Sequence, residues 1–153
     1  MSKVYIYLAG PVSGQTDQQA NTWREEFARS LAPFNIVGVS PIRYEPVKPE
    51  ERYLDEGQYD LELARQIITK NRIDVKRCDL TLAFMPTLSK GTLQEIGWAY
   101  GMEKPIIVVS DLGDVLMNPV IMGSCPWRFR YDEGAGLDKA LEVIIGLFHV
   151  YSN

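Results

Sequence analysis

The sequence predicts an α/β domain built on a doubly wound parallel sheet, and three observations lead to this prediction. Short apolar segments rich in β-branched residues alternate with longer segments of helical periodicity, which is the pattern of βαβ units. The run 105–110 is almost entirely β-branched, as is typical of a central strand covered on both faces. The chain has 153 residues, 46% hydrophobic and 24% charged, which fits one globular domain over residues 1–153.

Each expected element follows from a local pattern. Residues 3–9 alternate aromatic and β-branched side chains and end at Gly10, so they predict a first strand. Thr16 or Asp17 can cap a helix that continues to about Leu31. A polar loop with two prolines is expected over residues 42–57, long enough to be a lid or a binding loop. The remaining elements expected are strand 36–40, helix 58–77, strand 80–85, helix 92–102, strand 105–110, strand 127–131 and helix 137–148.

The order of the strands follows from the same pattern. Right-handed crossovers and an initial βαβ unit predict the flavodoxin-like order 2-1-3-4-5. This order places the topological switch point between the first and third strands, where ligands bind in open α/β folds. The turns that contain Gly10 and Gly91 are therefore expected side by side at the carboxyl edge of the sheet.

Composition argues against several classes of function. The net charge is −4 and the basic residues are scattered, so we expect no nucleic-acid partner. No apolar run approaches a membrane span, and the first residues lack the apolar core of a signal peptide, which predicts a cytoplasmic protein. Cys78 and Cys125 have no metal or redox spacing and are expected to be reduced core residues. His149 has no clustered second ligand, so no metal site and no cofactor are expected.

Glu95 has two possible roles. It is expected in the first turn of a helix that follows the buried strand 80–85, at the ligand-binding edge of the sheet. The run from Thr92 to Glu95 matches a capping box, in which the carboxylate would only close the helix N-terminus. Alternatively, Gly91 allows a ligand to approach closely and Glu95 is a nucleophile.

Other polar residues are expected near the same edge. Tyr7 shares a strand face with Ala9 and is either a packing residue or a partner for Glu95. Asn71 lies on the apolar stripe of its helix, formed by residues 61, 64, 67, 68 and 75, and a buried amide there needs a hydrogen-bond partner in the core or in a ligand. Ser89 can donate a hydrogen bond to a phosphate or sugar hydroxyl, or simply belong to a turn.

Taken together, these residues resemble the nucleoside 2-deoxyribosyltransferase family. The resemblance covers residues 3–129 and implies a flavodoxin-like fold and a retaining, ping-pong transfer without a cofactor. Glu95 matches the family nucleophile, which would attack the anomeric carbon of a 2′-deoxynucleoside and later pass the sugar to a second free nucleobase. The segments that carry the resemblance are Tyr7-Leu8-Ala9-Gly10-Pro11, Asn71 with Asp79, Ser89-x-Gly91-Thr92-x-x-Glu95-x-Gly97-x-Ala99, and Lys104-Pro105.

The resemblance also implies roles for further residues. Tyr7 matches a tyrosine that positions the nucleophile, and Gly10 and Gly91 match substrate-binding positions. Arg43 lies where the family contacts the base. Asn118 resembles a residue that contributes to the active site of a neighbouring subunit. This implies a homo-oligomer with shared active sites.

One position departs from the family pattern. Asn71 stands where the family usually has an aspartate that hydrogen-bonds or protonates the departing base. An asparagine can hydrogen-bond but cannot supply a proton by ionisation. The departure leaves several possibilities open: Asp74 or a water acts instead, another base is preferred, or the reaction is slow.

Two other functions remain open. Relatives of the family hydrolyse nucleoside 5′-monophosphates at the N-glycosidic bond, and Ser89 matches a serine that binds their 5′-phosphate. The loop after the first strand, residues 10–14, offers no basic residue for that phosphate. The other alternative is a nucleotide-binding module without catalytic activity. The asparagine at position 71, in place of the family aspartate, is the observation that favours it.

Overall fold

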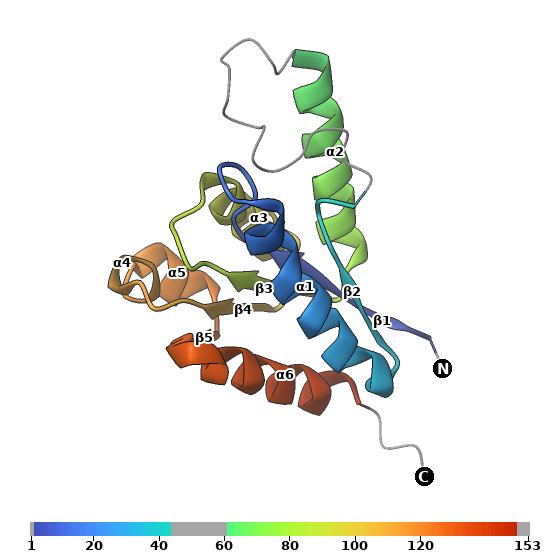
Figure 1. Cartoon of the computed structure of the whole chain (residues 1–153), viewed down its shortest axis with the longest axis vertical. Helices are drawn as coiled ribbons and strands as arrows, with labels where there is room; N and C mark the ends of the chain where they lie inside the picture. The colour runs from blue at the N-terminus through green and yellow to red at the C-terminus, as the bar shows by residue number, and fades with distance from the viewer. Residues whose placement is uncertain (1, 44–60, 150–153) are drawn as a thin grey trace.

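The computed structural model describes residues 2–43 and 61–149, and its centre is a five-stranded parallel sheet (Figure 1). The strand order is β2-β1-β3-β4-β5, which confirms the predicted flavodoxin-like arrangement. The strands are β1 (Val4–Ala9), β2 (Ile36–Val39), β3 (Leu80–Phe84), β4 (Ile106–Val109) and β5 (Trp127–Phe129).

Helices cover both faces of this sheet. The helices are α1 (Asp17–Leu31), α2 (Leu61–Arg77), α3 (Lys90–Gly101), α4 (Gly113–Leu116), α5 (Pro119–Ser124) and α6 (Ala135–Phe148). Helices α1 and α6 pack side by side over one face, while α2, α3 and α5 cover the other (Figure 1). The sequence did not predict α4 and α5, because four and six residues are too few to show helical periodicity.

The side chains of β1 point alternately toward the two helical layers, and this alternation decides which of them face the candidate site. Ile6 and Leu8 pack into the core under α1 and α6, whereas Tyr7 and Ala9 point to the face under α2 and α3. Since successive strand residues point to opposite faces, this register places the Tyr7 side chain on the α3 side of the sheet.

Helix α1 begins as the sequence predicted. The Thr16 Oγ1 accepts a hydrogen bond from the Gln19 backbone at 3.0 Å, and Gln19 Oε1 accepts one from the Thr16 backbone at 2.9 Å. These reciprocal hydrogen bonds form a capping box and fix the point where the loop after β1 ends and α1 begins.

The apolar stripe predicted along α2 is only partly buried. Val75 is fully buried, but Leu61 is 65% exposed and Ile68 is 42% exposed. The reason is that the first half of α2 extends past the sheet, so its apolar residues border a cavity instead of a core. The predicted loop 42–57 falls largely outside the described residues, as does the predicted start of the helix at Gln58.

Within residues 2–43 and 61–149, no helix has both the length and the apolar character needed to cross a bilayer.

Both cysteines are free and buried, with Cys78 2% exposed and Cys125 1% exposed. Burial raises the pKa of both thiols from 9.0 to about 12. We expect neither thiol to react with a disulfide reagent at neutral pH unless the protein is unfolded, because the thiolate is the reactive form. Rapid labelling of either cysteine in the native protein, counted by mass spectrometry, would contradict this prediction.

The same two thiols predict an alkaline loss of stability. The unfolded chain releases their protons near pH 9, while the folded chain holds them to about pH 12. The unfolded state therefore binds fewer protons across this interval, and the free energy of unfolding falls as the pH rises. In urea titrations, Cys78→Ala and Cys125→Ala variants should show a shallower fall over this interval than the unaltered protein.

Candidate active site

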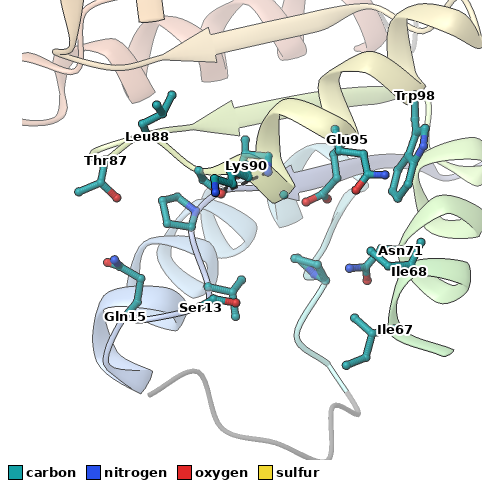
Figure 2. A pocket seen from close by; sticks show the side chains of 18 of the residues that line it. Ser13, Gln15, Ile67, Ile68, Asn71, Thr87, Leu88, Lys90, Glu95 and Trp98 are labelled. Atoms are coloured by element: carbon teal, nitrogen blue, oxygen red, sulfur yellow. Dashed lines mark hydrogen bonds between the residues drawn. The ribbon is translucent and has the colours of Figure 1, made fainter. Parts of the chain in front are cut away.

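A cavity of about 380 Å³ lies at the carboxyl ends of β1 and β3, where the sequence predicted the switch point. Its walls come from the β1–α1 loop, the start of α3 and the first half of α2 (Figure 2). Among the residues that line it are five of the predicted site residues, namely Gly10, Asn71, Ser89, Gly91 and Glu95.

The start of α3 tests the capping role of Glu95. The N-cap is Ser89, whose Oγ accepts hydrogen bonds from the Thr92 backbone at 3.2 Å and from the Thr92 hydroxyl at 2.9 Å. The predicted capping box from Thr92 to Glu95 is therefore wrong. Because the helix begins at Lys90, Glu95 lies in its second turn, 7% exposed, and its side chain lines the cavity. A carboxylate that is not needed for capping is available for chemistry.

Tyr7 lies next to this carboxylate, fully buried on β1. Burial and the negative charge of Glu95 raise the pKa of Tyr7 well above 10. The phenol therefore keeps its proton at any physiological pH and can donate it in a hydrogen bond to Glu95. Such a donor fixes the orientation of a carboxylate without neutralising it.

Asn71 faces the cavity from α2 and is 9% exposed. Its Oδ1 has no hydrogen-bond partner among the residues that the structure describes. Figure 2 shows the amide on the same side of the cavity as Glu95 and Trp98, with Ile67 and Ile68 beyond it. The predicted partner of this amide, in the core or in a ligand, is therefore not found among the described residues.

Asp74 and Arg43 are held together away from the cavity lining. Arg43 donates from Nη1 and Nη2 to the two carboxylate oxygens of Asp74, at 2.8 and 2.7 Å. Neither residue is among those that line the cavity around Glu95. Asp74 is engaged as a double acceptor, which argues against it as the replacement acid, and the base contact of Arg43 stays a prediction.

Asn118 lies at the N-terminus of α5 and is not among the residues that line the cavity. Its Oδ1 accepts a hydrogen bond from the Val120 backbone at 2.9 Å and caps that helix. The residues around it are apolar and open to solvent, with Met117 69% exposed and Val120 71% exposed. Within one chain, Asn118 does not line the cavity.

Arg24 is a site residue that sequence reasoning missed. It is 2% exposed and donates to the backbone carbonyls of Leu8 at 2.9 Å and Gly10 at 3.0 Å, and also to that of Ala20. These bonds hold the turn that forms one wall of the cavity. The available signal was its spacing, since Arg24 follows Ala20 by four positions and precedes Phe27 by three on the buried face of α1.

Gly10 shows why this turn requires glycine. A Cβ at this position would lie 2.7 Å from the Phe84 carbonyl oxygen and 3.0 Å from the Trp23 ring. The close approach lets the ends of β1 and β3 meet at the cavity floor.

Gly91 differs, because a Cβ there would meet nothing within 4 Å. We expect Gly91→Ala to preserve the fold, and even to stabilise α3 by up to about 1 kcal/mol, while it lowers activity because the methyl enters the cavity. Gly97 is the matched control, since it lies on the same helix, has the same open surroundings and does not line the cavity. Melting temperatures and initial rates of the two variants check the prediction, and equal activities would contradict it.

The described residues offer no group of three or more metal-ligating side chains. What the site provides is a buried carboxylate with a phenol beside it and an amide on the same side of the cavity, at the switch point of a parallel sheet. This combination is typical of α/β proteins that bind a small molecule at the carboxyl edge of the sheet.

A sequence model of the nucleoside 2-deoxyribosyltransferase family matches residues 6–143. The chain therefore belongs to this family, as the resemblance in its motifs predicted. No curated protein matches the chain by sequence.

Solved structures share the fold at low sequence identity. A 2-deoxyribosyltransferase from Bacillus psychrosaccharolyticus is 20% identical with a TM-score of 0.62, over 88% of this chain and 96% of that one. A CMP N-glycosidase from Clostridium botulinum is 19% identical with a TM-score of 0.58, over 91% and 98%. A conserved protein from Enterococcus faecalis is 22% identical with a TM-score of 0.53, over 95% and 96%.

Proposed function

We propose that this protein transfers a 2-deoxyribosyl group from one nucleobase to another through a covalent intermediate on Glu95. The observation that carries the proposal is the pairing of the buried Glu95 carboxylate with Tyr7 in a cavity at the switch point. Membership of the nucleoside 2-deoxyribosyltransferase family supports the substrate class.

In the first half of the reaction, a Glu95 oxygen attacks the anomeric carbon of a 2′-deoxynucleoside. The new carbon–oxygen bond forms as the bond to the base nitrogen breaks, and the base leaves with the electron pair and takes a proton from water. In the second half, a ring nitrogen of another base attacks the same carbon and loses its proton, and the Glu95 carboxylate is released. Two inversions at one carbon retain its configuration.

The lining of the cavity suggests how a nucleoside lies in it. Trp98, Ile67 and Ile68 form an apolar end around Asn71 (Figure 2). The opposite end is polar, with Ser13, Ser89 and Lys90. A flat base fits the first end and the sugar with its 5′ substituent fits the second, which leaves the anomeric carbon near Glu95.

The polar end supports an alternative, the hydrolysis of nucleoside 5′-monophosphates. The Ser89 hydroxyl accepts the two hydrogen bonds from Thr92 described above. Its own proton can therefore be donated to a phosphate oxygen. The loop after β1 has no basic residue, but Lys90 at the start of α3 provides a positive charge that a phosphate could contact. The similar fold of a CMP N-glycosidase is consistent with this chemistry.

A product assay separates these functions. The protein is incubated with thymidine and free adenine, and in parallel with nucleoside 5′-monophosphates in water. New deoxyadenosine supports transfer, whereas release of a pentose 5-phosphate supports hydrolysis. Binding of nucleosides without any product supports the non-enzymatic module and would overturn the proposal.

The role of Tyr7 gives a separate prediction. A hydrogen bond to a charged group is worth about 1.5–3 kcal/mol, so Tyr7→Phe should lower kcat roughly ten- to a hundredfold without abolishing it. Tyr5→Phe is the matched control, since Tyr5 lies on the same strand and the same face of the sheet but is 40% exposed and does not line the cavity. Unchanged kinetics for Tyr7→Phe would remove Tyr7 from the mechanism.

We further propose that Asn118 serves the active site of a neighbouring copy in a homo-oligomer. The support is its place among the exposed apolar residues Met117, Val120 and Met122. Its Oδ1 is occupied by the helix cap, while its Nδ2 can donate to a substrate in another subunit. Sedimentation measurements of Val120→Asp, which places a charge in this surface, should show smaller particles than the unaltered protein.

A further inference from the structure

We infer that Arg24 is a positioning residue for Glu95: its buried positive charge, held against the turn at Gly10, keeps the Glu95 carboxylate ionised for attack on the sugar. The inference rests on the proposed function for the role of Glu95 as the nucleophile. It goes beyond that function because Arg24 belongs to α1, in the other helical layer, and does not line the cavity. Its starting point is the burial of this arginine, which is 2% exposed.

Arg24 is held in one place at the carboxyl end of β1. Its Nε donates to the Leu8 carbonyl at 2.9 Å and its Nη2 to the Gly10 carbonyl at 3.0 Å. The guanidinium carbon lies 4.8 Å from the centre of the Trp23 ring, which is within the range of a cation–π contact. A guanidinium stays protonated at every physiological pH. Arg24 therefore provides a fixed positive charge at this end of the strand.

Gly10 brings this charge close to the cavity. It is one of the residues that line the cavity, together with Glu95. A Cβ at Gly10 would lie 3.2 Å from the Arg24 Nη2, so the guanidinium contacts a turn that itself forms part of the cavity wall. Arg24 and Glu95 are both buried, and charges inside a protein are screened by salt much less than exposed charges. The field of the guanidinium therefore extends into the cavity.

The Tyr7 phenol, which lies beside Glu95, responds to this field. Burial and the negative charge of Glu95 raise the pKa of Tyr7, and the positive charge of Arg24 partly offsets the rise. A cation whose field reaches the phenol is expected to act on the carboxylate next to it as well. A nearby positive charge favours the ionised form of a carboxyl group. Ionised Glu95 is the form that the proposed attack requires.

No other side chain in the described ranges supplies the same buried positive charge. Arg24 is the only basic residue that is buried among the residues that the structure describes. The Arg43 guanidinium and the Asp74 carboxylate oppose each other within one ion pair. Lys90 lines the cavity but is exposed, so that solvent screens its charge. The other titratable groups packed in this core are the neutral thiols of Cys78 and Cys125.

The first test compares Arg24→Gln, which removes the charge, with Arg24→Lys, which retains it. Without the cation Glu95 takes up its proton at a higher pH, so the acid limb of the kcat/KM profile of Arg24→Gln should move up by about one pH unit. The limb of Arg24→Lys should stay in place, although both variants lose hydrogen bonds to the carbonyls. An unmoved limb in Arg24→Gln, or an equal shift in both variants, would overturn the inference.

Arg29→Gln is the matched control, because it removes the same charge from an exposed position of the same helix. It should leave the acid limb of the profile in place. A shift as large as that of Arg24→Gln would mean that the net charge of the protein, and not a buried cation near Gly10, sets the limb. That result would also overturn the inference.

A second measurement requires neither turnover nor an altered Arg24. In the unaltered protein, the NMR signal of the Arg24 Nε–H group, which donates to the Leu8 carbonyl, should shift with pH as Glu95 titrates. The same signal should stay constant in Glu95→Gln, which has no carboxyl at this position and keeps the Ser89 cap of α3. A titrating signal without any transfer product would support the inference and contradict the proposed function. A signal that does not respond to pH, or that titrates equally in Glu95→Gln, would overturn the inference.

Discussion

Replacing Glu95 by glutamine is expected to abolish turnover, with a fall in kcat on the order of 10⁴-fold or more. The physical reason is that the amide keeps the size of the side chain but has no anionic oxygen to attack the anomeric carbon. Since Glu95 does not cap α3, its replacement removes no bond that starts the helix. The free energy of unfolding should therefore fall little or rise.

The control for this experiment is Glu142→Gln, the same change at an exposed position of α6 on the opposite face of the sheet. It should leave both activity and stability unaltered. Mass spectrometry of the unaltered protein quenched during turnover should find a chain heavier by one deoxyribosyl group, absent from Glu95→Gln. Retained turnover in a folded Glu95→Gln variant would exclude Glu95 as the nucleophile.

Replacing Arg24 by methionine is expected to lower the free energy of unfolding by about 2–4 kcal/mol. Methionine fills much of the same space, but the carbonyls of Leu8 and Gly10 lose their guanidinium donors inside the protein. The turn that forms a wall of the cavity also loses its anchor, so KM for the nucleoside should rise as well.

Arg29→Met on the exposed face of α1 is the matched control, since it removes the same charge without burial. Urea unfolding of both variants measures the difference. An equal loss of unfolding free energy in the two variants would mean that the buried hydrogen bonds of Arg24 contribute nothing to stability beyond its charge.

The sheet was predictable from the sequence because its strands are short apolar runs bounded by glycine, proline and polar residues. The order of the strands then followed from handedness and from the βαβ alternation. Asn71 was predictable as a buried polar residue because helical spacing alone places it in line with Ile67 and Val75. None of these inferences needed knowledge of a side-chain contact.

The failures have local physical causes. The run from Thr92 to Glu95 looked like a cap, but Ser89 lies three residues earlier and takes the Thr92 backbone N–H. Arg24 looked like one of several charged residues on an amphipathic helix, and only the carbonyls of a distant strand end explain its burial. The ion pair between Arg43 and Asp74 was also missed, because no local pattern predicts a contact between residues 31 positions apart.

The partly exposed first half of α2 has a consequence for how such a protein can change over time. Ala64, Ile67 and Ile68 border the cavity but contribute little to the main core, which is formed by the strands and the packed faces of the other helices. Mutations at these three positions can therefore reshape the cavity at a small cost in folding. The proposed nucleophile, Glu95, and the Tyr7 phenol, in contrast, belong to elements whose packing holds the sheet together. If the proposed function holds, substrate range and chemistry are carried by separate parts of the chain and can be varied independently, by selection or by design.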